Sequence, residues 1–456
     1  MTPVRISPFN DTTIAITNGD SRQTMFNVQE EANRLYRGKA LAPMVRASTT
    51  PLRTLALEYG ADLVYTEELI DRSIRETVRQ ENSVLGTIDY VKDTSQLSKK
   101  TQKKLSREQR PCLILRIDPS VETSRLICQL GTGEPDLALE AALHVHQDFS
   151  AIDINMGCPK KFSVSGGMGS ALLKDPVRAA KLISTLRHHI PKPISCKIRL
   201  LSTAQETVDF VEQMIAAGVN AVAIHARKVG QEATVPADWK TLEKVVHQLR
   251  SQHPTFPFLL NGDFYDRDEL QELQLKTNAS GVLLGRPALY NTSLFRPLEQ
   301  SLEDKTKVIQ RYLQLAARYD IHFKNPKYVV CEMMNNRRAP TPRVPHLPQD
   351  FSSGGQTIAK TCNCSSLQQL FQVWNLEWKG MGRAALGMVE ESNATTTTTN
   401  ADAALAPGEH RYEDSYFLGT HKRAAIQDQE TDKNPVHKRP KVEIMDNDTK
   451  HEEKKE

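Results

Sequence analysis

An asparagine and a cysteine follow one buried strand closely enough to act on the same bound molecule. The run Ala151–Asn155 alternates apolar and polar side chains, which predicts a short strand, and the residues up to Pro159 end it. Cys158, in this break, can serve as a nucleophile if it is a thiolate or as a proton donor if it stays a neutral thiol. Lys160 and its neighbour Lys161 would favour the thiolate, so the sequence leaves both roles open.

Seven further apolar runs, separated by segments with helical periodicity, predict strands of the same kind. Buried strands that alternate with helices indicate a parallel sheet, and eight such units in roughly 250 residues favour a closed barrel over a doubly wound sheet. We therefore predict an α/β fold, a (β/α)8 TIM barrel followed by a smaller all-α domain and a disordered C-terminal tail. The eight runs are centred on Leu41, Leu63, Leu126, Ile152, Cys196, Ala223, Leu259 and Leu283.

Polar or small residues close nearly every one of these strands. The C-terminal ends of parallel strands meet at one rim of a barrel, where barrel enzymes carry their active sites. We therefore predict an active site at that rim. Its candidate residues are Met44 and Arg46, Glu67, Gln129, Asn155 and Cys158, Lys197 and Arg199, His225 and Arg227, Asn261 and Asp263, and Gly285 with Arg286.

The ends of strands seven and eight suit a phosphate group. Asn261-Gly262-Asp263 and Gly285-Arg286 lie where many barrels bind phosphate through loop amides and a helix N-terminus. Glycine lets the backbone approach the phosphate closely, and Arg286 can add a charged contact. This pattern would fit any barrel enzyme that binds a phosphate ester.

The other rim residues suit a flat ring that accepts electrons. Gln129, Lys197 and His225 could surround such a ring, with the lysine stabilising negative charge on it, while residues 42–44 offer a backbone edge and an apolar side chain. One phosphate site beside such a ring suits FMN, which would then carry the redox chemistry. No G-x-G-x-x-G fingerprint follows a strand, which argues against NAD or FAD in a Rossmann domain.

Taken together, these motifs closely resemble those of the tRNA-dihydrouridine synthases, over roughly residues 38–385. The Ala-Pro-Met-Val-Arg run, Glu67–Asp71 and the methionine of Asn-Met-Gly-Cys-Pro look most like the eukaryotic branch that modifies uridine 20 of the D-loop. The motifs that carry the resemblance are Leu41-Ala-Pro-Met44, Asn155-Met-Gly-Cys-Pro159, Gly166-Gly-Met-Gly169, Cys196-Lys-Ile-Arg199, His225-Ala-Arg227, Asn261-Gly262 and Gly285-Arg286.

The resemblance implies a two-stage reaction with bound FMN and NADPH as the reductant. Hydride would pass from reduced FMN to C6 of uracil, and Cys158 would be the general acid that protonates C5. Asn155 would help to hold the uracil of a base extruded from the folded tRNA. The residues implied to hold FMN are Ala42, Pro43, Met44, Gln129, Lys197, His225, Asn261, Gly262, Asp263, Gly285 and Arg286. Those implied to contact the tRNA are Asn155, Lys160, Arg199, Arg227, Lys324, Arg337 and Arg338.

Composition divides the chain into five segments. Residues 301–390 hold 12 lysines and arginines against 7 acidic residues, a net charge of +5, and resemble the helical recognition domain of the family, which would grip phosphates. Residues 391–456 hold 10 against 14, a net charge of −4, with few aromatic residues. We predict a flexible extension at 1–37, an FMN-binding barrel at 38–297 with an inserted basic loop at about 91–110, a helical tRNA-recognition domain at 298–390, and a disordered tail at 391–456.

Several classes of protein and site are not expected. Seven scattered cysteines do not suggest a disulfide framework, and Cys362-Asn-Cys364 lacks the second pair that a zinc site needs. No apolar run is long enough to span a membrane, and the N-terminus lacks the pattern of a secretory signal. We expect a cytoplasmic monomer, with His437–Lys441 as a candidate patch for nuclear import.

Two alternatives stay open at this point. One is an FMN-dependent oxidoreductase of free pyrimidines, of the dihydroorotate or dihydropyrimidine dehydrogenase type, and the other is an RNA-binding barrel that has lost catalysis. Two departures from the family also bear on RNA binding: Ser165 stands where some relatives have a basic residue, and no double-stranded-RNA-binding module follows residue 390.

Overall fold

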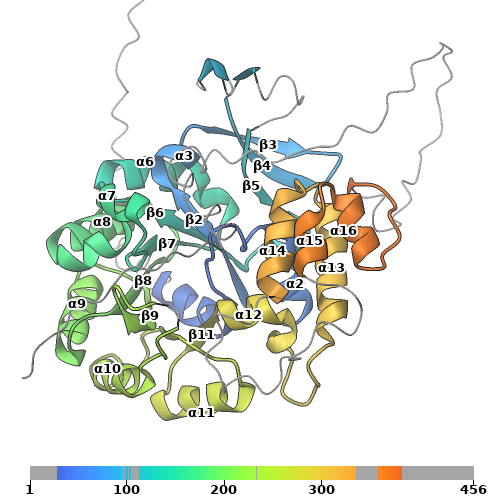
Figure 1. Cartoon of the computed structure of the whole chain (residues 1–456). Coiled ribbons are helices and arrows are strands. Elements are labelled where there is room, and N and C mark those ends of the chain that lie inside the picture. Colours follow the sequence, from blue (N-terminus) through green and yellow to red (C-terminus); the bar gives the residue numbers. More distant parts are fainter. Residues whose placement is uncertain are drawn as a thin grey trace, which may run out of the picture. The chain divides into compact units, whose positions relative to one another are not determined.

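A computed structural model of the chain describes residues 28–93, 95, 98–100, 102–103, 112–232, 234–334 and 358–382, all within one compact unit (Figure 1). Eight parallel strands form a closed barrel in the order β1-β11-β10-β9-β8-β7-β6-β2, which confirms the predicted (β/α)8 architecture and all eight predicted strands. The strands are β1 (Gly38–Leu41), β2 (Leu63–Ile70), β6 (Leu126–Gly131), β7 (Ala151–Asn155), β8 (Ile194–Leu200), β9 (Ala221–Lys228), β10 (Phe258–Asn261) and β11 (Gly281–Leu284).

Helices surround the barrel strands and pack on them through apolar faces (Figure 1). Their starts follow from capping residues: for example, the Asp175 side chain accepts a hydrogen bond from the Arg178 amide, and Pro176 occupies the first turn. The longer helices are α2 (Thr50–Glu58), α6 (Pro135–Val145), α8 (Pro176–His189), α9 (Ala204–Ala216), α10 (Trp239–Gln252) and α11 (Arg267–Thr277). Shorter ones are α3 (Asp71–Ile74), α5 (Pro119–Glu122), α7 (Lys161–Ser165), α12 (Arg286–Tyr290) and the 3-10 turns His146–Asp148, Gly169–Lys174 and Thr292–Phe295.

The interior of the barrel is apolar at one end and polar at the other. Inward-facing residues alternate along each strand, so an inward apolar residue is followed two positions later by an inward residue nearer the C-terminal rim. In β9, for instance, Ala223 is inward and apolar, and His225 follows it. The apolar set is Ala32, Tyr36, Ala40, Ala42, Leu63, Tyr65, Ile127, Ala151, Ala221, Ala223, Leu259 and Leu283.

A short helix over residues 28–35 corrects the prediction of irregular structure for residues 1–37. Ala32 and Tyr36 are fully buried against the apolar end of the barrel, and the Gln29 amide donates to the Asn220 carbonyl oxygen at 3.1 Å. Val28, Ala32 and Tyr36 recur every four residues, which is helical spacing that the polar residues around them mask. Residues 1–27 lie outside the described part of the chain.

An antiparallel sheet outside the barrel flanks the predicted basic loop in sequence. Strands β3 (Thr77–Asn82), β4 (Thr87–Lys92) and β5 (Cys112–Ile117) pair in that order, so the insertion starts before residue 91 and ends after residue 110. Strand β3 is mostly polar and half exposed, so it carries little of the apolar signal by which a buried strand is predicted. Most of residues 94–111 lie outside the described part.

Four helices follow the barrel: α13 (Lys305–Arg318), α14 (Lys324–Met334), α15 (Ile358–Asn363) and α16 (Leu367–Val373). The first of these helices has one apolar face, in which Val308, Tyr312, Leu315 and Ala316 are all buried. Among the described residues no helix is long and apolar enough to cross a membrane. The predicted tail at 391–456 lies outside the described residues, and the predicted domain boundaries remain predictions.

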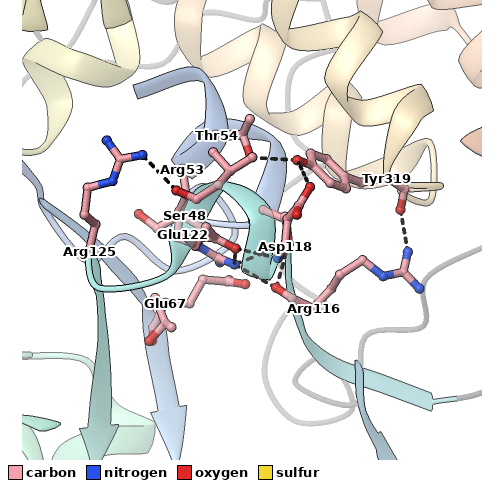
Figure 2. A network of polar contacts seen from close by, with 12 residues as sticks. Ser48, Arg53, Thr54, Glu67, Arg116, Asp118, Glu122, Arg125 and Tyr319 are labelled. Carbon is pink, nitrogen blue, oxygen red and sulfur yellow. Dashed lines mark hydrogen bonds and ion pairs between the residues drawn. The ribbon is translucent and has the colours of Figure 1, made fainter. Parts of the chain in front are cut away.

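A buried polar network joins the end of α13 to the barrel (Figure 2). The Tyr319 hydroxyl donates to the Asp118 carboxylate at 2.8 Å and accepts from Thr54 at 3.1 Å. In the same network Arg53 lies in a fully buried ion pair with Glu122 at 2.5 Å, and its guanidinium also donates to the Ser48 carbonyl oxygen at 2.8 Å. The segment between Ala42 and Ser48, at the rim, is thereby held by the same network.

Candidate active site

A directed chain of hydrogen bonds runs across the rim from β8 to the loop that bears Cys158. The Ser195 hydroxyl donates to Asp153 at 2.6 Å, and the Gln129 amide nitrogen donates to the other Asp153 oxygen at 2.7 Å. The Gln129 oxygen accepts from the Asn155 amide nitrogen at 3.0 Å, and the Asn155 oxygen accepts from the backbone amides of residues 157 and 158, both at 3.0 Å. Because a carboxylate only accepts, this order fixes which way both side-chain amides face.

Asp153, which accepts two of these hydrogen bonds, was not predicted as a site residue. Its burial raises the pKa of the carboxyl group to about 6, while the hydrogen bonds from Ser195 and Gln129 and the nearby charge of Lys197 oppose that rise. Its inward position between Ala151 and Asn155 on β7 was the available signal, since all three share one face of the strand.

Lys197 and His225 lie beside this series of hydrogen bonds and differ in charge. Burial and the neighbouring Arg199 lower the pKa of the Lys197 amine to about 8, although Asp153 opposes this shift. Burial first, and then the positive charge of Lys197, lower the pKa of His225 well below its ordinary value, so this imidazole is neutral at pH 7. This part of the rim can therefore offer a cation and a neutral hydrogen-bonding ring to an electron-accepting group.

The phosphate end of the rim is organised by Asp263. One of its carboxylate oxygens accepts from Arg286 at 2.7 Å, and the other accepts from Arg227 and from the Ala237 amide at 2.9 Å. Both oxygens of Asp263 thus hold arginines, and its predicted contact with the cofactor remains a prediction. Arg227 is only 1% exposed and also donates to the Val235 carbonyl at 2.7 Å, whereas Arg286 is partly exposed.

Ala42, Met44 and Gly285 lie together just beyond the ends of β1 and β11. A Cβ atom at Gly285 would lie 3.7 Å from the Ala42 side chain and 3.8 Å from the Met44 sulfur, so its backbone faces a small apolar wall. Pro43 lies between Ala42 and Met44 in the sequence. The Asn261 side-chain amide donates to the Leu283 carbonyl oxygen at 2.8 Å. At Gly262 a Cβ would lie 3.0 Å from the Trp239 indole nitrogen, so any side chain there would press on this ring.

The loop of residues 42–48 is supported from two sides. Ser48 accepts from the Met44 amide at 3.1 Å and donates to the Ala42 carbonyl at 2.9 Å, which closes the loop upon itself. Asn325 of α14 donates to the Arg46 carbonyl at 2.8 Å, and Arg46 has a positive φ of 69°. The helices that follow the barrel therefore contact the loop that bears three of the predicted FMN residues.

The Cys158 thiol is neutral at physiological pH in this structure. Burial, followed by the negative charge of Glu68, raises the pKa of this thiol to about 11, and the hydrogen bond from the backbone of Lys160 opposes the rise only in part. The two roles that the sequence left open are thus separated, because a neutral thiol can donate a proton and is a weak nucleophile. Arg199 donates to the Gly157 carbonyl at 2.9 Å and so braces the loop before the thiol.

Comparison with known proteins places this rim in a family. The family model for dihydrouridine synthases matches residues 67–338, more than half of the chain. The chain belongs to the dihydrouridine synthase family. The match includes the loop with Cys158, the strands that carry Lys197 and His225, and Asp263 after β10.

The relatives of this chain include several yeast proteins. A tRNA-dihydrouridine(20) synthase [NAD(P)+] of Schizosaccharomyces pombe is 38% identical over 301 residues, which are 64% of this chain and 59% of that protein. The protein of the same name from Saccharomyces cerevisiae is 34% identical over 310 residues, 66% of this chain and 78% of that protein. A tRNA-dihydrouridine(16/17) synthase [NAD(P)(+)] of S. pombe is 28% identical over 268 residues, 58% of this chain and 59% of that protein. The chain thus spans about three fifths of the first relative.

The predicted RNA contacts are dispersed over the described residues. Lys160 and Lys324 are exposed, Arg199 is half-buried at the rim, and Arg227 is buried behind it. Arg337 and Arg338 lie outside the described residues. Within the described residues no group of three or more histidine, cysteine, aspartate or glutamate side chains could hold a metal ion.

Glu68 is a second rim residue that the sequence analysis missed in this family member. Glu67 was predicted at the rim, but a β-bulge shifts the register of β2 between Tyr65 and Glu68, so that Glu68 pairs with Gln129. Thr66 and Glu67 together then stand opposite one residue of β6, and Glu68 takes the inward position. Glu67 instead accepts a hydrogen bond from the Arg46 amide. A one-residue slip of this kind leaves no signal in the sequence pattern.

Proposed function

We propose that this chain is an FMN-dependent tRNA-dihydrouridine synthase that reduces the C5–C6 double bond of a D-loop uridine, uridine 20, with NADPH as the reductant. The observation that carries the proposal is a neutral Cys158 thiol at the rim of a barrel that matches the dihydrouridine synthase family. The two most similar yeast relatives reported above support position 20, since both are named for it.

The residues at the rim fit FMN. The small apolar wall of Ala42, Met44 and Gly285 suits a ring or its ribityl chain, and Arg286, with Asp263 behind it, suits a phosphate. Bound FMN would supply the hydride that adds to C6 of the uracil. The residues that would hold it are Ala42, Pro43, Met44, Gln129, Lys197, His225, Asn261, Gly262, Gly285 and Arg286, with Asp263 and Arg227 fixing the arginine contact.

The chain's own residues would supply the proton and the orientation. Cys158 holds a proton on its sulfur atom that C5 of the uracil takes up, and the charge of Lys197 stabilises negative charge on the flavin ring. The oxygen of Asn155 already accepts two backbone hydrogen bonds, so this side chain can offer only an N–H group to the uracil. That N–H group suits a uracil carbonyl oxygen.

Binding of tRNA would rest on contacts with phosphates rather than with bases. Lys160 lies beside the thiol and Lys324 begins α14, and both are exposed. Arg337 and Arg338 would extend this set, on the strength of the net charge of +5 over residues 301–390. We further propose a monomer that acts in the cytoplasm, with the basic patch His437–Lys441 directing part of it to the nucleus.

The test is an anaerobic titration followed by absorbance. The purified protein should show an oxidised flavin spectrum, NADPH should bleach it, and unmodified tRNA should restore it, while free uracil and orotate should not. Reoxidation by a free base would instead indicate the pyrimidine oxidoreductase. Absence of flavin from a protein that binds tRNA would indicate a barrel without catalysis.

A further inference from the structure

A buried carboxylate stands next to the thiol that the proposed function uses. Glu68, near the end of β2, is only 4% exposed, and its negative charge acts on the Cys158 thiol. The Ser163 hydroxyl of α7 donates to the Glu68 carboxylate at 3.3 Å. Three elements, β2, the loop after β7 and α7, thus bring a carboxylate, a hydroxyl and a thiol into one cluster.

Two glycines next to this cluster have no space for a side chain. A Cβ at Gly131 would lie 2.7 Å from a Glu68 carboxylate oxygen, and a Cβ at Gly169 would lie 2.4 Å from the Ser163 hydroxyl and 3.0 Å from the Cys158 Cβ. Gly169 also has a positive φ of 58°, which favours glycine there. The bulge in β2 turns Glu68 into this space, and bulges near active sites commonly re-aim a side chain.

The charged groups around the thiol differ in sign. Lys197 and Arg199 of β8 interact electrostatically with Cys158 and favour its thiolate, and so does the backbone hydrogen bond from Lys160. Glu68 opposes them from β2, because its negative charge favours the neutral thiol. Without this carboxylate, the electrostatic balance at the sulfur atom would shift toward the two cations of β8.

We propose that Glu68 is a positioning residue for Cys158, whose carboxylate accepts the thiol hydrogen and thereby keeps the proton on the sulfur atom until a substrate carbon takes it. The proposal rests on the proposed function, in which Cys158 supplies a proton. The carboxylate fixes the direction of the S–H bond, and the Ser163 hydroxyl holds the carboxylate in turn. Glu68 need not touch the substrate itself.

The experiment measures how fast iodoacetamide alkylates Cys158 in the purified full-length protein at different pH values. Only the thiolate reacts, so the rate follows its ionised fraction, and mass spectrometry of the Cys158 peptide reports it. The exposed Cys362 is an internal reference in the same sample. In the unaltered protein the midpoint of the Cys158 profile should lie well above that of Cys362.

Three variants separate charge from shape. Glu68→Gln keeps the size of the side chain but removes its charge, and it should speed alkylation of Cys158 at pH 8 by about fivefold or more, with the midpoint shifted to lower pH. Glu68→Asp keeps the charge and should stay within about twofold of the unaltered protein. Glu76→Gln, which alters an exposed carboxylate paired with Lys92, is the matched control and should change nothing.

Equal profiles for Glu68→Gln and the unaltered protein would overturn the proposal. So would a midpoint for Cys158 in the unaltered protein at or below that of Cys362, a result that does not depend on how any variant folds. The alkylation is read without tRNA or NADPH, so its outcome is independent of the proposed function, and a failure of tRNA to reoxidise the protein would leave the alkylation profiles unchanged.

Discussion

At the scale of single residues, Cys158 lies between opposed charges. Glu68 stabilises its thiol, whereas Lys197 and Arg199 stabilise its thiolate, and burial adds to the first effect. A proton donor that must be present at neutral pH and lose its proton only to a substrate carbon needs this kind of balance.

Replacement of Cys158 by alanine should separate the two halves of the reaction. The variant should keep bound flavin and its reduction by NADPH, because Cys158 is not among the residues that we place around the cofactor. Reoxidation by tRNA should slow by about 10²- to 10⁴-fold, the usual contribution of a general acid. Stopped-flow absorbance of both half-reactions checks this, and loss of flavin from the variant would instead mark Cys158 as structural.

The Lys197 amine should make flavin binding depend on pH. Its pKa of about 8 means that its charge is present below pH 8 and is lost above it. If FMN binds to the charged form, the Kd of the flavin-free protein for FMN should rise about tenfold between pH 7 and pH 9.

Fluorescence titration of FMN measures this, with Lys197→Arg and Lys197→Met as controls. The arginine variant keeps its charge and should show little change over the same range, and the methionine variant should bind weakly at both pH values. A rise that persists unchanged in the methionine variant would assign the pH dependence to another group.

The sequence predicted the chemical types at the rim better than it predicted their partners. Cys158 follows β7, Asn155 ends it, and Lys197 lies in the second half of β8. They were found because polar residues near strand ends are conspicuous. Asp153 lies within a strand, and Glu68 reaches the rim only through a bulge, so neither could be placed without the register of the sheet. Asp263 was predicted correctly as a rim residue, but its two arginine partners became visible only in the structure.

At the scale of elements, the ion pair between Arg53 of α2 and Glu122 of α5 is a buried connection (Figure 2). Replacement of Glu122 by alanine leaves the Arg53 charge buried without its carboxylate and removes the acceptor of the Asp118 amide. We expect the free energy of unfolding to fall by about 3 kcal/mol or more.

Urea denaturation followed by circular dichroism measures the effect. The matched control is Glu140→Ala, whose carboxylate pairs with Arg75 at the surface and should cost less than about 1 kcal/mol. A similar fall in the free energy of unfolding in both variants would show that the buried ion pair stabilises the protein no more than the exposed one does.

The same scale shows which elements a sequence reveals. Barrel strands are buried on both faces and read as apolar runs, so all eight were predicted. The sheet of β3, β4 and β5 has a polar first strand, and the helix at residues 28–35 has only one apolar residue per turn, so both were missed. The all-α character of the segment after the barrel was predicted, and α13 shows the regular apolar face that such a helix carries.

At the scale of the whole molecule, the chain combines a family barrel with segments of opposite charge. Residues 301–390 carry a net charge of +5 and residues 391–456 a net charge of −4. Because an acidic segment repels phosphates, we place RNA binding in the first of these segments and not in the second.

Deletion of residues 391–456 should therefore leave turnover of tRNA within about threefold of the full chain at physiological salt. Dihydrouridine formed per minute, measured by mass spectrometry, checks this. Charge reversal at Lys160 and Lys324, which are exposed, should by contrast raise the KM for tRNA. A large loss on deletion would mean that the acidic segment contributes to RNA binding.

The most direct test of the central claim is the chemical change in the RNA. Unmodified tRNA transcript is incubated with the protein and NADPH, digested to fragments, and each fragment is weighed by mass spectrometry. The account predicts a gain of two hydrogen atoms in the D-loop fragment that contains uridine 20, and no gain when that uridine is replaced by cytidine. An unchanged fragment, from a protein that carries flavin and is reduced by NADPH, would contradict the assignment of tRNA uridine 20 as its substrate.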